Sequence, residues 1–207
     1  MRALLYKDFV ITWRYSKLIL FMALLFSILG GMKTEVSFIG VYAPLVLASL
    51  SSNTLAYDEK SGWLKYADGL PYGRTAIVQS KYLQAFLGCL VGMALPAISV
   101  VFVGLIRGEV FLEGMPILLA GMLAAGTLNS VIVLPLSFRY DTNKGRIAFI
   151  VILAVLFGIG SQFLVVPVFE QLAGHIAWML TVTVAVCLVL WVVSYELSIL
   201  FYRNKSI

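Results

Sequence analysis

Residues 83–106 read LQAFLGCLVGMALPAISVVFVGLI and contain no charged side chain. A membrane-spanning α-helix needs about 20 mostly apolar residues, because each residue advances the helix by about 1.5 Å and the hydrocarbon core is about 30 Å thick. This stretch is therefore long enough to cross a membrane as one helix. A transmembrane β-barrel would instead show short segments of alternating polarity, and this sequence has none.

The rest of the chain has the same character, with 61% hydrophobic and only 12% charged residues and a mean hydropathy of +0.99. Soluble domains usually contain about 25% charged residues, so lipid is the expected solvent of most of this surface. We predict an all-α membrane protein that forms a single domain over residues 1–207. Six transmembrane helices are expected, at residues 14–32, 36–57, 82–106, 114–138, 147–166 and 176–201.

The 15 basic residues predict the orientation. Cytoplasmic loops of membrane proteins carry an excess of Lys and Arg, and with the N-terminus inside only Lys33 and Arg107 lie outside. We therefore expect a multi-pass protein of the plasma membrane with both termini in the cytoplasm. The cytoplasmic basic residues are expected to form a collar that faces anionic lipid headgroups, not a nucleic-acid site. They are Arg2, Lys7, Arg14, Lys17, Lys60, Lys65, Arg74, Lys81, Arg139, Lys144, Arg146, Arg203 and Lys205.

The first 17 residues, MRALLYKDFVITWRYSK, predict a separate amphipathic helix. Leu5, Phe9 and Trp13 recur at four-residue spacing and form an apolar stripe, whereas Lys7 and Asp8 lie off it. Such a helix is expected to lie along the cytoplasmic membrane surface. It could serve as a simple membrane anchor or could help to frame the docking site of a partner.

The longest polar segment is YDEKSGWLKYADGLPYGRTAIVQSKY, from Tyr57 to Tyr82, and it mixes charged with aromatic residues. Asp58 is expected to cap a short cytoplasmic helix over residues 59–67, which Asp68-Gly69 would end. An aromatic and aliphatic face on such a helix suits docking into a groove of a partner. The alternative is an interfacial helix that lies on the lipid headgroups.

Glycine and proline residues predict details of the packing. Gly88 and Gly92 form a small-xxx-small pair that favours a close helix contact. Pro44, Pro96 and Pro135 predict kinks, because a proline removes one backbone hydrogen bond from a helix.

The sequence contains no pattern typical of a catalytic or metal site. Cys89 and Cys187 both lie in apolar stretches and are expected to be small buried side chains. Residues 69–75 resemble a phosphate-binding loop only loosely, since three residues instead of four separate the glycines and Arg replaces Lys. We therefore expect no catalytic residue, no metal and no cofactor in this chain.

Polar residues inside the predicted spans are few. Asn129 and Gln162 could line a substrate path or could form hydrogen bonds between helices. Glu170 could face an exit vestibule or could simply be solvated. Glu196 is expected near the cytoplasmic interface, paired with a basic residue of the N-terminal helix or of a loop.

The segment from Tyr57 to Tyr82 resembles the segment after the second span of type-2 ABC transporter (ABC-2) permeases, which follow a pattern like yDEk-sgw-ky-lP-sr-iv-sKY. The N-terminal helix, the six spans and the internal termini are also similar to that family, so the resemblance covers the whole chain. Among subgroups, the chain looks most like permeases of bacterial exporters for amphipathic peptides, such as the phenol-soluble modulin exporter.

The resemblance implies a permease that pairs with a second permease, as a homodimer or a heterodimer, and docks on a separate ATP-binding subunit that holds ATP and Mg²⁺. Residues 1–17 would be the elbow helix, residues 58–80 the cytoplasmic coupling segment, and the residues after Pro167 a re-entrant helix. The residues that would dock on the ATPase are Asp58, Glu59, Lys60, Trp63, Leu64 and Tyr66.

The function expected on these grounds is export of an amphipathic peptide or another hydrophobic substrate. A drug or lipid exporter permease is an alternative, and so is the membrane-embedded substrate-capture subunit of an importer. An intramembrane enzyme would need clustered His, Asp, Glu, Cys or Ser side chains, whereas this chain has one histidine and no carboxylate in the middle of a predicted span.

Overall fold

The computed structural model describes residues 2–32, 38–69, 73–108, 115–160 and 176–204. Within these ranges every regular element is a helix, which agrees with the predicted all-α class. The helices are α1 (Arg2–Tyr15), α2 (Lys17–Met32), the 3-10 helix η1 (Phe38–Val41), α3 (Tyr42–Ala48), α4 (Leu50–Lys60), α5 (Trp63–Asp68), α6 (Arg74–Arg107), α7 (Met115–Arg139), α8 (Thr142–Gly160) and α10 (Ile176–Arg203).

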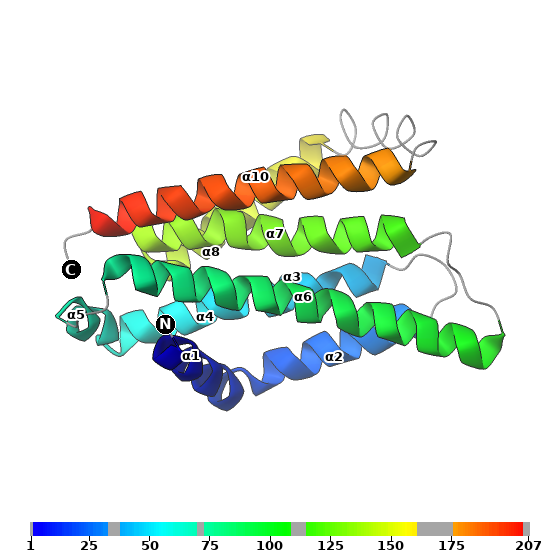
Figure 1. Ribbon diagram of the computed structural model, residues 1–207, viewed down its shortest axis with the longest axis horizontal. Coiled ribbons are helices and arrows are strands. Elements are labelled where there is room, and N and C mark those ends of the chain that lie inside the picture. The colour runs from blue at the N-terminus through cyan, green and yellow to red at the C-terminus, as the bar shows by residue number, and fades with distance from the viewer. Residues whose placement is uncertain (1, 33–37, 70–72, 109–114, 161–175, 205–207) are drawn as a thin grey trace.

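The long helices lie side by side along the long axis of the molecule (Figure 1). Helices α2, α3–α4, α6, α7 and α10 follow this axis and α8 is tilted across it, whereas α1 is bent by 79° relative to α2. The short helix α5 lies at one end of the bundle, together with α1 and the C-terminal end of α10. That end therefore collects the segments that the sequence assigns to the cytoplasm.

Among the residues that the structure describes, three helices are long and apolar enough to cross a membrane, namely α6, α7 and α10. The bent pair α1–α2 could form a fourth crossing. At about 1.5 Å per residue, even α7, with 25 residues, is longer than the hydrocarbon core of about 30 Å. Six crossings stay a prediction, because α2 and α3–α4 do not meet this criterion and the predicted fifth span extends beyond the described part of α8.

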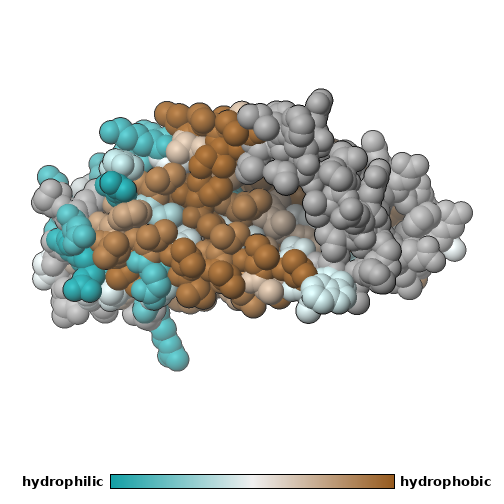
Figure 2. Space-filling model, turned by 90° about the horizontal axis from the view of Figure 1, so that it is seen from above, coloured by the Kyte–Doolittle hydropathy of each residue, from teal (hydrophilic) through white to brown (hydrophobic). Residues whose placement is uncertain are grey.

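The surface agrees with a lipid environment. One face of the molecule shows a hydrophobic band over its middle, and hydrophilic side chains gather toward the end where α5 lies (Figure 2). Large apolar side chains such as Ile98, Phe102, Leu188 and Val189 are more than half exposed on the spanning helices. Exposure of this kind is unfavourable in water but costs nothing against lipid tails.

The predicted close contact at Gly88 and Gly92 is present, and it joins α6 to α3. A Cβ atom added to Gly92 would lie 2.3 Å from the Cα atom of Pro44, and one added to Gly88 would lie 2.5 Å from the carbonyl oxygen of Leu47. Gly88 and Gly92 thus let α3 and α6 pack nearly backbone against backbone. On α7, Gly126 makes room for a side chain instead, because an added Cβ would lie 2.5 Å from the Sγ atom of Cys89.

The helices continue through two of the prolines predicted to kink them, Pro96 in α6 and Pro135 in α7. Proline has no N–H group, so Pro135 leaves the Val131 carbonyl without its usual partner four residues along the helix. The Ser194 hydroxyl of α10 donates to this carbonyl at 2.9 Å. A side chain from a neighbouring helix thus satisfies the freed backbone group inside the bundle.

We expect Gly92→Ala to lower the free energy of unfolding by about 1–3 kcal/mol, because the new methyl group would force α3 and α6 apart. Gly121→Ala on α7 is the matched control, since its added Cβ meets only the Cγ2 atom of Val41, at the ordinary contact distance of 3.7 Å. Thermal unfolding of the purified variants in detergent measures both effects. Equal midpoints for the two variants would contradict the close contact.

Candidate docking site and the buried ion-pair cluster

The segment predicted to dock on a partner forms two helices separated by a turn. Helix α4 continues to Lys60, so Asp58 lies within it and does not cap a new helix as predicted. The turn depends on Gly62, whose φ of 71° lies in the left-handed region that glycine adopts without strain. Helix α5 therefore begins at Trp63, later than the predicted start at Glu59.

Helix α5 has one face in the protein core and one face in solvent. Leu64 and Ala67 are buried in a cluster with residues of α4, α6, α7 and α10, and Trp63 packs against it. Tyr66 is 68% exposed, and Lys65 is exposed beside it. The buried face fixes α5 on the end of the bundle, and the opposite face is open to a partner.

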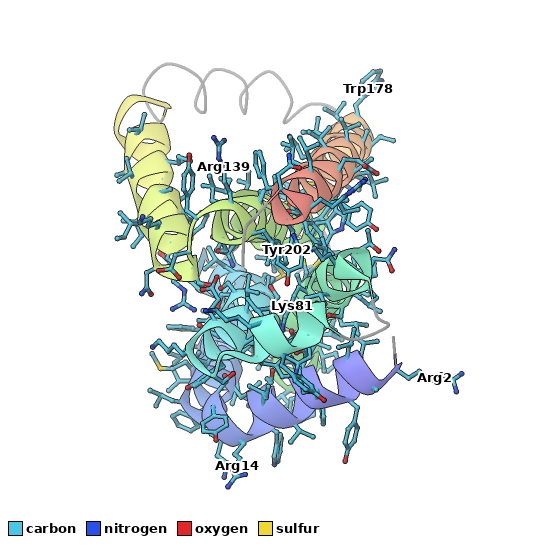
Figure 3. All side chains as sticks on the ribbon, turned by 90° about the vertical axis from the view of Figure 1, so that its left-hand side faces the viewer. Arg2, Arg14, Lys81, Arg139, Trp178 and Tyr202 are labelled. Carbon is cyan, nitrogen blue, oxygen red and sulfur yellow. The ribbon has the colours of Figure 1, made fainter. Side chains whose placement is uncertain are left out.

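Beneath α5, a cluster of four charged side chains, three of them buried, joins α1, α4 and α6. The Lys81 ammonium of α6 lies 2.7 Å from Asp8 Oδ1 of α1 and 2.7 Å from Asp58 Oδ2 of α4. All three side chains are at most 2% exposed. Figure 3 shows Lys81 in the middle of the bundle, whereas Arg2 and Arg14 point away from it.

Lys7 completes the cluster and connects it to α5. Its ammonium lies 2.7 Å from Asp58 Oδ1 and 3.3 Å from Asp8 Oδ1. It also lies 3.4 Å from the centre of the Trp63 ring, a cation–π contact. Two lysines thus balance two aspartates, and the formal charge of the cluster is zero.

A chain of polar contacts extends the cluster along α1. Lys81 donates to the Thr54 hydroxyl at 3.1 Å, and this hydroxyl lies 2.8 Å from the side-chain oxygen of Gln84. The Gln84 amide in turn donates to the Thr12 hydroxyl at 2.9 Å. Helix α1 is therefore held by polar contacts at Asp8 and at Thr12, one turn apart.

Glu59, the neighbour of Asp58, binds a different helix. Its Oε2 atom accepts hydrogen bonds from the backbone N–H of Thr142 at 3.1 Å and from the Thr142 hydroxyl at 2.7 Å. Thr142 is the first residue of α8, where unpaired N–H groups and the helix dipole favour a negative charge. Consecutive carboxylates at the end of α4 thus fix three other helices, α1, α6 and α8.

The family is established by comparison with known proteins. A family model described as "ABC-2 family transporter protein" matches residues 3–203. The chain belongs to the ABC-2 transporter family. No curated protein and no solved structure matches it. Membrane components of the ABC-2 family are in general transport subunits that work with a separate ATP-binding subunit.

In this ABC-2 protein, the six residues predicted to dock on an ATPase divide into two groups. Asp58 and Leu64 are buried, and Glu59 is half-buried against α8, so their contacts are within the chain. Trp63 is half-buried below Lys7. Lys60 and Tyr66 are exposed and remain accessible to a second chain.

The sequence patterns did not reveal the ion-pair cluster, and the predicted place of Lys81 is wrong. Lys81 is 1% exposed and cannot face lipid headgroups as part of a basic collar. On α1, the packed face consists of Leu4, Asp8 and Thr12, whereas Phe9 and Trp13 of the predicted apolar stripe are 66% and 64% exposed. The four-residue spacing of Leu4, Asp8 and Thr12 was a signal that could have revealed this face.

The residues proposed for a substrate path are only partly described. Asn129 is buried on α7 and donates to the Leu45 carbonyl of α3 at 3.4 Å, a contact between helices. Gln162, Glu170 and the predicted re-entrant segment lie outside the described residues. Glu196 is exposed on α10, and its predicted pairing with a basic residue stays a prediction.

The cysteines and acidic residues do not gather into a metal site within the described ranges. Cys89 and Cys187 are buried and free. Cys89 fills the space beside Gly126, and the Sγ atom of Cys187 lies 3.2 Å from the Thr127 hydroxyl. Both therefore serve packing between helices in this structure.

We expect Lys81→Met to lower the free energy of unfolding of this ABC-2 protein by about 3–5 kcal/mol, because it leaves a buried carboxylate without its partner. The double variant Lys81→Met/Asp8→Asn restores the charge balance and is expected to regain a large part of this loss. Denaturant unfolding in detergent compares the two with Lys65→Met, an exposed control that should change stability by less than about 0.5 kcal/mol. A double variant as unstable as the single one would contradict the pairing.

Proposed function

We propose that this ABC-2 protein is the permease subunit of an exporter that moves an amphipathic peptide or another hydrophobic substrate outward, driven by ATP hydrolysed on a separate subunit. The observation that carries the proposal is α5, which is fixed on the end of the bundle by its buried face and exposes Lys65 and Tyr66. A helix with this arrangement is suited to fit a groove on a partner. In this role α5 is the coupling helix, and α1 is the elbow helix.

The contacts beneath α5 provide a route by which a movement of the ATPase reaches the membrane helices. A displacement of α5 would act on α1 through Trp63 and Lys7, and on α6 and α8 through Asp58 and Glu59 at the adjoining end of α4. ATP can drive transport only if it binds the two conformations of the transporter with different affinity. These charged contacts are elements whose rearrangement would distinguish such conformations.

The proposed topology has six crossings with both termini in the cytoplasm. In support, α1 and the C-terminal end of α10 lie at the same end of the bundle, as an even number of crossings requires (Figure 1). The distribution of basic residues favours a cytoplasmic location for this end. The partners proposed are an ATP-binding subunit and a second permease, identical or different.

The proposed substrate class rests on the character of the spans. Residues 82–106, 115–138 and 176–195 contain no charged side chain. Ion-coupled transport and recognition of charged solutes usually place ionisable residues within the membrane. A path between uncharged helices suits an amphipathic or lipid-like molecule, and the resemblance to peptide exporters favours the peptide.

We expect Tyr66→Glu to reduce co-purification with the proposed ATP-binding subunit by on the order of fivefold, because the new charge would be buried in the docking groove without a partner. Tyr140→Glu is the matched control, since Tyr140 is also an exposed tyrosine at this end of the bundle. The thermal unfolding midpoints of both variants should equal that of the native chain. Unchanged co-purification and unchanged ATP-driven transport for Tyr66→Glu would refute docking through α5.

The orientation has a separate test. We expect single cysteines introduced as Ser61→Cys and Asn143→Cys to react with a membrane-impermeant maleimide only after cells are permeabilised. Both positions are exposed, and a background that lacks Cys89 and Cys187 removes the natural thiols. Labelling of either position in intact cells would contradict the cytoplasmic location of this end.

A further inference from the structure

A small polar pocket lies between α4 and α8, and the export function proposed above does not use it. It is lined by Asn53, Ala56, Tyr57 and Lys60 of α4 and by Arg146 of α8. The four α4 residues are spaced three and four apart, so they form one face of that helix. The pocket has a volume of about 120 Å³, which is a few times the volume of one water molecule and too small for a drug-sized ligand.

The charge of this α4–α8 pocket suits an anion. Lys60 and Arg146 line it, whereas Glu59 and Asp141, the nearest acidic residues in the sequence, do not. The Oε2 atom of Glu59 instead accepts hydrogen bonds from Thr142. The pocket walls therefore carry two positive charges and no negative one.

The Arg146 guanidinium is oriented by a hydrogen bond to Asn53 and has further N–H donors. One of its Nη2 hydrogens is donated to the Oδ1 atom of Asn53, across the pocket. A guanidinium group has five N–H donors in a planar arrangement that matches phosphate oxygens. Within the described part of the chain, Asn53 is its only hydrogen-bond partner, so the other donors are available to a ligand.

An apolar surface begins where the pocket ends. Ile147, Ile150 and Val151 follow Arg146 on α8 and are 62%, 64% and 55% exposed. Ile150 lies four residues after Arg146 and therefore on the same face of the helix. A ligand with an anionic head and an apolar tail would fit this arrangement along its whole length.

We propose that the α4–α8 pocket binds the phosphate group of an anionic phospholipid, whose acyl chains lie along the exposed face of α8. Lys60 and Arg146 provide the positive charge, and Asn53 orients the Arg146 guanidinium. Basic pockets between membrane helices on the cytoplasmic side are suited to such headgroups. The site would hold the α4–α8 contact, which also includes Glu59 and Thr142, against the lipid surface.

Native mass spectrometry of the purified full-length chain in detergent tests the site, with phosphatidylglycerol and phosphatidylcholine titrated separately. We expect phosphatidylglycerol to bind more tightly, and Lys60→Gln and Arg146→Gln each to weaken that binding by on the order of fivefold. Lys144→Gln is the control, because it removes the same charge from an exposed position of α8 that does not line the pocket. Lys60 is itself exposed, so its variant should fold normally.

Inorganic phosphate distinguishes the two sources of the same chemistry. Displacement of phosphatidylglycerol by millimolar phosphate would show that the pocket recognises the phosphate group alone. Resistance to phosphate, together with loss of binding in Lys60→Gln, would show that the acyl chains contribute and that the lipid is the ligand. Equal affinity for the two lipids, or equal weakening by Lys144→Gln and Lys60→Gln, would overturn the proposal. None of these readouts depends on export or on the ATP-binding subunit.

Discussion

The Lys81 side chain is 1% exposed, and its ammonium group lies between the carboxylates of Asp8 and Asp58. An ammonium group removed from water costs several kcal/mol unless opposite charges and hydrogen bonds surround it. Asp8 comes from α1 and Asp58 from α4, so the charge is compensated only when both helices pack against α6. This charge compensation thus contributes to the position of α1, which meets α2 at 79°. Its aromatic side chains Phe9 and Trp13 face outward.

Helix α6 connects this polar cluster to the opposite side of the bundle. The residue after Lys81 is Tyr82, and its hydroxyl lies 2.6 Å from Ser194 Oγ and 2.7 Å from Ser198 Oγ of α10. At the start of α6, the Arg74 guanidinium donates to the carbonyls of Tyr202 and Arg203. Cations are favourable at the C-terminal end of a helix, where carbonyl groups lack partners. One helix therefore holds α1 and α4 on one side and α10 on the other.

The same end of the molecule carries the surfaces on which the proposed functions depend. Leu64 and Ala67 fix α5 on the core, and Tyr66 remains exposed on its outer side. Lys60 of α4 lines the α4–α8 pocket, together with Arg146 of α8. In the proposed arrangement, residues only a few positions apart would contact a partner protein, the ion-pair cluster and a lipid headgroup. In an ABC-2 transporter, this proximity would make lipid contact and ATPase contact sensitive to the same displacement of α4.

The sequence by itself determined that the chain is helical, apolar and related to ABC-2 permeases, and it predicted the close contact at Gly88 and Gly92. In lipid, backbone groups must find partners within their own segment, so local composition decides where helices form. Only the tertiary structure paired Asp8 with Lys81 and Glu59 with Thr142, which are 73 and 83 residues apart. Such pairs depend on how each helix is rotated about its axis relative to its neighbours. The sequence of one segment does not determine that rotation, because the rotation results from the packing of all the helices together.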